Sequence, residues 1–230
     1  MGKTIGNIKS NKNIVLGSVI SYIIIGINVI FGFFSIPLII KWVGDSGYGL
    51  FTLATSVINV FVIDFGLGNA ASHHLSKALA NNDDEHFKDT ASLIFRIFTI
   101  MDIVFGLTIL FILIFAQSIF KGLTISEIGT FRGIFTIVGI FSLIALPSTI
   151  FNSILSAHEK FFFIKSINLA TRVLYIIIVL IVLFLGGGLY GLVITHVLTE
   201  IGSILIKYFF VRFKLKTKII LTRKISKEEK

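Results

Sequence analysis

The polar side chains with the clearest chemical potential lie inside long apolar stretches of this sequence. They are Asn28, Asp64, Arg96, Asp102, Arg132, Asn152, Arg172, His196 and Glu200. A charge in an apolar medium costs at least about 2.5–3.5 kcal/mol, so it normally faces a partner or a water-filled cavity. Acids and arginines paired between helices would only hold a bundle together. A polar path through the interior is the second interpretation, and the sequence leaves both open.

Chemistry of other kinds finds little support. The chain has no cysteine, which excludes disulfides, thiol nucleophiles and cysteine metal sites. HExxH, Walker and Ser/His/Asp patterns are missing from the polar segments. The adjacent His73 and His74 point to different sides of a helix, which favours a polar cap over a metal site. We therefore predict that the chain is not an enzyme and needs neither a metal nor a cofactor.

One segment imitates a nucleotide site. Residues 66–71 read GLGNAA, similar to the GxGxxA turn that binds dinucleotides. That turn must follow a short strand, whereas the apolar run here reaches back to about residue 48 and further apolar stretches follow it. The glycines more plausibly let a helix bend or pack closely against a neighbour.

The elements that must position these side chains are membrane-spanning helices. Hydrophobic residues make up 55% of the chain and charged residues 14%, against about 25% charged in a soluble domain. A spanning helix needs roughly 20 mostly apolar residues. Six stretches qualify, at about 14–43, 48–72, 92–117, 131–155, 164–185 and 189–210. We predict an all-α, polytopic membrane protein with a six-helix lobe over 1–212 and a basic tail over 213–230.

Lysine and arginine are distributed unevenly between the connections. They are concentrated before the first stretch, in the two longer loops at 77–89 and 157–165, and in the tail. Lys41 and Lys121 fall on the other side. By the positive-inside rule both termini are cytoplasmic, and the net charge of +9 indicates orientation in a membrane rather than binding to nucleic acid. The tail could bind anionic lipid headgroups, although an ordinary stop-transfer flank is the favoured interpretation.

The N-terminal third has a recognisable pattern. The sequence reads PLIIKWVG over 37–44, YGLF over 48–51 and DFGLGNA over 64–70. This pattern resembles the start of bacterial polysaccharide-biosynthesis membrane proteins. These are the O-antigen and teichoic-acid type flippases of the multidrug/oligosaccharidyl-lipid/polysaccharide exporter superfamily. The resemblance is most specific over about 14–77.

The resemblance implies two six-helix lobes around a central hydrophilic cavity in the bacterial cytoplasmic (inner) membrane. It further implies that a polyprenyl-linked glycan enters from the cytoplasmic side and that its head group is moved outward. With about six helices, this chain looks like the N-terminal lobe alone. Its expected partners are membrane lipids, the glycolipid and a second six-helix lobe, either a separate chain or a second copy.

The resemblance and the chemistry of the side chains together suggest roles. Arginine binds phosphate oxygens in pairs through its planar fork. The candidates for contact with the substrate head group are Asn28, Arg96, Arg132 and Arg172. The candidates for ion coupling, or for pairing those arginines, are Asp64, Asp102 and Glu200. A cation-coupled drug exporter of the same superfamily and a non-transporting scaffold or assembly subunit are the alternative functions.

Overall fold

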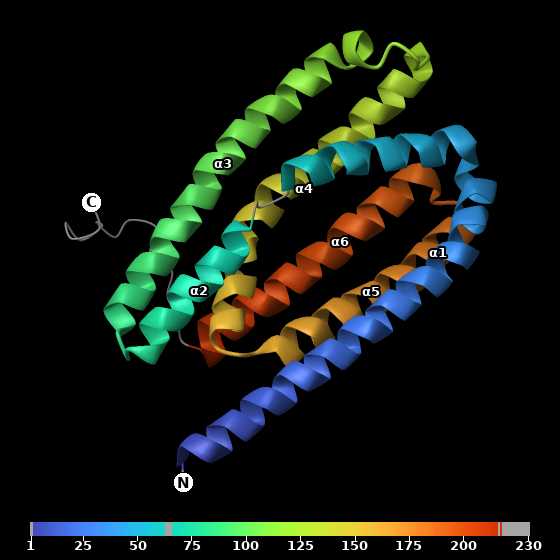
Figure 1. Cartoon of the computed structure of the whole chain (residues 1–230). Coiled ribbons are helices and arrows are strands. Elements are labelled where there is room, and N and C mark those ends of the chain that lie inside the picture. Colours follow the sequence, from blue (N-terminus) through green and yellow to red (C-terminus); the bar gives the residue numbers. More distant parts are fainter. Residues whose placement is uncertain (1, 63–65, 216, 218–230) are drawn as a thin grey trace.

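The computed structural model describes residues 2–62, 66–215 and 217, and this part of the chain contains helices and no strand. The helices are α1 Gly2–Val62, α2 Leu67–Ala80, α3 Asp84–Ile119, α4 Ile125–Ala157, α5 Phe161–Phe184 and α6 Gly188–Phe209, followed by the π-helical turn η1 Phe210–Lys214 (Figure 1). Five helical segments in the described part are long and apolar enough to cross a membrane. The all-α, multi-pass prediction is confirmed.

Helix α1 reverses direction partway along its length, where the sequence predicts the end of one helix and the start of another. Gly44 has φ 76° and ψ 162°, a conformation that interrupts the helix and that side-chain-bearing residues rarely adopt. Figure 1 shows α1 rising from the N-terminus and turning back on itself in its second part. The predicted stretches 14–43 and 48–72 therefore form a hairpin. Within the second stretch a separate helix, α2, begins at Leu67 after Gly66, whose φ is 82°.

Local sequence explains where α3 and α4 begin. The carboxylate of Asp83 accepts a hydrogen bond from the backbone N–H of His86 at 2.9 Å and caps α3. Thr124 and Glu127 form a capping box at the start of α4, in which each side chain accepts from the other residue's backbone N–H. Both helices extend well beyond the apolar stretches that predicted them.

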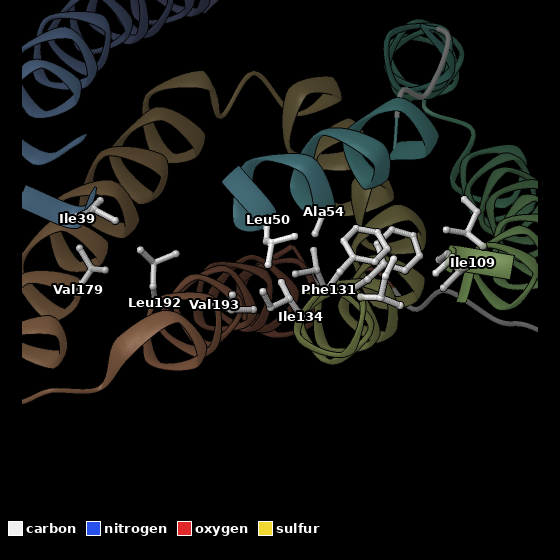
Figure 2. Close-up of a cluster of buried hydrophobic side chains, with 14 of the residues drawn as sticks. Ile39, Leu50, Ala54, Ile109, Phe131, Ile134, Val179, Leu192 and Val193 are labelled. Carbon is white, nitrogen blue, oxygen red and sulfur yellow. The ribbon is translucent and has the colours of Figure 1, made fainter. Parts of the chain in front are cut away.

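Several helices that follow one another in the sequence pack side by side and run antiparallel. Helix α3 contacts α4, α5 contacts α6, and α1 lies against both α4 and α5. A cluster of buried apolar side chains joins these elements, including Leu50 and Ala54 of α1, Phe131 of α4 and Leu192 of α6 (Figure 2). This cluster fixes the second part of α1 against α4 and α6.

The outer faces of the bundle are apolar as well. Phe33 is 78% exposed, and large apolar side chains such as Ile100, Leu107, Ile140 and Phe184 are also exposed. Continuous apolar surface of this extent is unfavourable in water and suits a lipid environment.

The two ends of the bundle differ in charge. Figure 1 shows the N-terminus, the α2–α3 turn and the α4–α5 turn at one end, with the Gly44 bend and the α3–α4 turn at the other. The first end carries Lys77, Lys88, Lys160, Lys165 and Arg212 near its turns. This concentration of basic residues at one end is what the positive-inside argument requires. The cytoplasmic position of that end stays a prediction. Most of the predicted basic tail, 213–230, lies outside the described residues.

Candidate functional site

Two polar stripes face each other across α5 and α6. On α5 the stripe consists of Asn168, Thr171, Arg172 and Tyr175, and on α6 it consists of His196, Glu200, Ser203 and Lys207. Residues three and four apart lie on the same side of a helix. Each stripe therefore presents its polar groups in one direction, even though both helices are otherwise strongly apolar.

The stripes line a cavity of about 460 Å³, hereafter the polar pocket. Ile24 and Asn28 of α1 and Asn152 of α4 complete its lining. Four helices thus contribute to one site. Arg172 stands near the middle of the 24-residue helix α5, so the pocket reaches to about the middle of the bundle.

Arg172 is held by two aromatic rings. Its guanidinium carbon lies 5.4 Å from the centroid of the Phe31 ring and 5.5 Å from that of Tyr175. The two rings contact each other edge to face at 6.4 Å. Cation–π attraction of this kind strengthens when the cation is removed from water. The guanidinium is therefore fixed in position, yet its buried Nε atom has no hydrogen-bond partner among the described residues.

Lys207 supplies a second cation. Its side chain is only 8% exposed, and its Nζ donates a hydrogen bond of 2.9 Å to Oδ1 of Asn168. Glu200 lies two turns earlier on the same face of α6 and interacts electrostatically with Lys207 and His196. The His196 ring contacts Tyr175 edge to face at 5.6 Å. The polar pocket therefore contains two cations and one acid, together with amide and hydroxyl groups.

A second cavity of about 390 Å³, hereafter the aromatic pocket, continues from the first. It shares Arg172, Tyr175 and His196 with the polar pocket. Its other lining residues come from the two parts of α1 and from α4: Phe31, Gly32, Ser35, Ile36, Ile39, Tyr48, Phe51, Thr55, Val138, Phe141, Ser142 and Ala145. The polar pocket extends toward the lysine-rich end of the bundle and the aromatic pocket toward the Gly44 bend.

The structure brings together three of the residues predicted from the sequence. Asn28, Arg172 and Glu200 all line the polar pocket. Arg132 does not: it is exposed, and its guanidinium donates to the carbonyl oxygen of Ile114 at 3.2 Å, outside both pockets.

Two further predicted residues, Arg96 and Asp102, stand apart from the polar pocket. Arg96 and Asp102 lie on α3, which contributes no residue to its lining. Asp102 is 8% exposed, and its Oδ1 has no hydrogen-bond partner in the described part of the chain. Asp64 lies outside the described residues.

Sequence reasoning assigned no role to several lining residues. Asn152 and His196 were recognised as polar groups within apolar stretches, whereas Asn168 and Lys207 were not singled out. The signal that could have found them is the helical spacing: Asn168 precedes Arg172 by four residues, and Lys207 follows Glu200 by seven.

Comparisons with known proteins agree with the fold. The family model described as polysaccharide biosynthesis protein matches residues 14–228. A comparison with curated proteins found no match. The crystal structure of a MATE in complex with MaD3S superimposes with a TM-score of 0.77 at 18% identity, covering 95% of this chain and 50% of that one.

A second solved structure gives the same result. An outward-facing multidrug resistance MATE family transporter of the MOP superfamily superimposes with a TM-score of 0.72 at 18% identity, covering 94% of this chain and 48% of the other. The chain therefore shares its fold with about half the length of each of these transporters.

Proposed function

The chain belongs to the polysaccharide biosynthesis protein family, and from this premise we propose that it forms one lobe of a membrane exporter for lipid-linked oligosaccharide. The shared fold with MATE transporters supports an exporter architecture. The proposed location is the bacterial cytoplasmic membrane, with both termini in the cytoplasm. A second six-helix lobe, as another chain or another copy, would complete the assembly.

The polar pocket is the observation that carries this proposal. It places Arg172 near the middle of a membrane helix and holds it between Phe31 and Tyr175, with no ion pair to a carboxylate among the described residues. A cation held in this way is available to an anionic or hydroxylated ligand. The head group of a lipid-linked glycan has both kinds of group, and its lipid portion suits the exposed apolar faces.

The experiment is photolabelling of membranes that contain the chain. The probe is a polyprenyl diphosphate glycan with a photoreactive group on its sugar. We expect Arg172→Ala to reduce labelling about tenfold or more, because hydrogen bonds to charged groups contribute about 1.5–3 kcal/mol. Arg132→Ala is the matched control, since it also removes an intramembrane arginine but lies outside both pockets. Equal labelling of wild type and Arg172→Ala, at equal membrane levels, would refute the assigned role.

A cation-coupled drug exporter is the second candidate. Glu200 shares the polar pocket with Tyr175, and the adjoining pocket is lined by further aromatic rings. Acidic and aromatic groups together suit an organic cation. In that case a lipophilic cation such as tetraphenylphosphonium would bind, Glu200→Gln would abolish its binding, and the glycolipid probe would not label the pocket. A non-transporting scaffold would bind neither probe within its helices.

A further inference from the structure

A third cavity lies between α2 and α3 and shares no lining residue with the polar or aromatic pocket. Its volume is about 500 Å³, and we refer to it as the α2–α3 groove. The two helices pack side by side (Figure 1). Ala70 and Ala71 of α2 are among its lining residues. Because their methyl groups are small, these two alanines leave the space between the helices open.

The groove is polar at one end and apolar along the rest of its length. Its polar lining residues, His74, His86 and Thr90, belong to the parts of α2 and α3 that lead to the turn between them, at the lysine-rich end of the bundle. Ile97 lines it farther along α3, and Leu67 lines it at the start of α2. A groove with this gradient complements an amphiphile better than a wholly polar or a wholly apolar ligand.

The length of the groove matches the depth of one membrane leaflet. A helix rises about 1.5 Å per residue, so α3 follows the groove for about 16 Å from His86 to Ile97. The hydrocarbon of one leaflet is about 15 Å deep, half of a core of about 30 Å. Ile97 is exposed, and so are Ile100 and Val104 beyond it on α3, so the groove opens onto the lipid-facing surface. An acyl chain of the surrounding bilayer therefore has both the access and the length to lie in it.

One cation and one acid flank the polar end of the groove. Lys77 follows His74 by three residues, on the same side of α2. Asp83 lies at the start of α3, where its carboxylate accepts a hydrogen bond from the backbone N–H of His86. The side chains of Lys77 and Asp83 are both exposed. A lysine beside an imidazole suits a phosphate, and a carboxylate suits an ammonium group. Together they complement a zwitterionic head group.

We infer that the α2–α3 groove is a binding site for one phosphatidylethanolamine molecule from the leaflet at the lysine-rich end. One acyl chain lies in the groove, the phosphate accepts hydrogen bonds from His74 and Lys77, and the ammonium donates to Asp83. Phosphatidylglycerol would bring a net negative charge to a turn that also carries Asp84 and Glu85. Phosphatidylcholine has no N–H to donate to a carboxylate. The site is separate from the polar pocket and does not depend on the exported substrate.

The test is photolabelling of the full chain in phosphatidylcholine nanodiscs. The probe is a trace of phosphatidylethanolamine with a diazirine on one acyl chain, and the labelled residues are mapped by peptide mass spectrometry. We expect the label to concentrate on the lining residues within 67–74 and 86–98. Replacing part of the phosphatidylcholine by unlabelled phosphatidylethanolamine should lower this labelling about two- to fivefold more than replacing it by phosphatidylglycerol, which is the range expected of an exposed ion pair.

Two pairs of variants test the groove and its polar end. Ala70→Phe places a ring in the groove and should reduce labelling, whereas Asn69→Phe adds the same ring at an exposed neighbouring position that lines none of the three cavities. Asp83→Asn keeps a side-chain oxygen for the helix cap and removes the charge. It should abolish the preference for phosphatidylethanolamine over phosphatidylglycerol in the competition. Asp84→Asn neutralises an exposed acid one residue farther on and should keep that preference.

Each contrary result overturns a stated part of the inference. Label spread evenly over the exposed apolar faces, or undiminished labelling of Ala70→Phe at equal membrane levels, would overturn the groove as a lipid site. Equal competition by the two unlabelled lipids would overturn the assigned head group, and a retained preference in Asp83→Asn would overturn the role of Asp83. Absence of label from the groove, with α2 crosslinked to a second copy of the chain, would assign this face to an interface between copies instead.

Discussion

The reversal of α1 at Gly44 leads to a sharp prediction about stability. The residue has φ 76° and ψ 162°, a region that is essentially restricted to glycine. A Cβ added at this position would meet no atom within 4 Å. Gly44→Ala therefore introduces backbone strain without a steric clash. Its expected cost is about 1–3 kcal/mol, which corresponds to roughly a fivefold to 150-fold loss in the folding equilibrium.

Gly49→Ala is the matched control. Gly49 lies in the second part of the same helix, and an added Cβ there also meets nothing within 4 Å. Because its backbone is helical, alanine should be neutral or more favourable than glycine by up to about 1 kcal/mol. The two variants add the same methyl group to α1, and only the backbone conformation distinguishes them.

The assay is thermal unfolding of the purified chain in detergent. We expect Gly44→Ala to unfold several degrees below wild type, by roughly 2–4 °C for each kcal/mol lost, and Gly49→Ala to unfold at or above the wild-type temperature. The bend also positions Tyr48, Phe51 and Thr55 at the aromatic pocket. Indistinguishable unfolding temperatures for the two variants would refute the reasoning about Gly44.

Three further predictions concern other elements. Gly187→Ala should destabilise the α5–α6 turn in the unfolding assay, and adding Val182→Ala should not restore stability, because the new Cβ would lie 2.8 Å from the Val182 carbonyl oxygen. Gly191→Ala should also destabilise the turn, but here adding Val182→Ala should restore stability, because the new Cβ would meet only Cγ1 of Val182, at 2.6 Å. Thr124→Ala removes the capping box of α4 and should cost about 1 kcal/mol, measured by thermal unfolding. Glu200→Gln removes the acid of the polar pocket and should tighten binding of inorganic pyrophosphate severalfold; unchanged or weaker binding in calorimetry would contradict its action as a counter-charge.

The helices were predictable because their signal is local. Apolar runs of spanning length located every long helix, and the alternation of lysines located the two ends. The break of α1 at Gly44 was visible as a glycine between two apolar runs. The start of a separate helix at Leu67, after Gly66, was not visible, because the apolar run continues past Gly66 and glycine is common inside membrane helices.

The site was predictable only in part, and the reason is geometric. Counting along a span gives the depth of a residue but not the direction in which it points. Arg172 and Arg132 both looked like intramembrane cations, yet α5 turns Arg172 into the polar pocket and α4 turns Arg132 outward to Ile114. In helices that are apolar on almost every side, the facing direction is set by tertiary packing. Only the repeated polar spacing on α5 and α6 indicated it.

The residues shared by the two pockets have a thermodynamic consequence. Arg172, Tyr175 and His196 belong to both linings, so the two cavities cannot bind independently. A ligand in the polar pocket that draws the guanidinium toward itself changes what the aromatic pocket can offer to a second ligand. Linkage makes this influence reciprocal: each ligand changes the other's dissociation constant by the same factor. The single cation between Phe31 and Tyr175 thus makes one coupled binding unit out of two cavities.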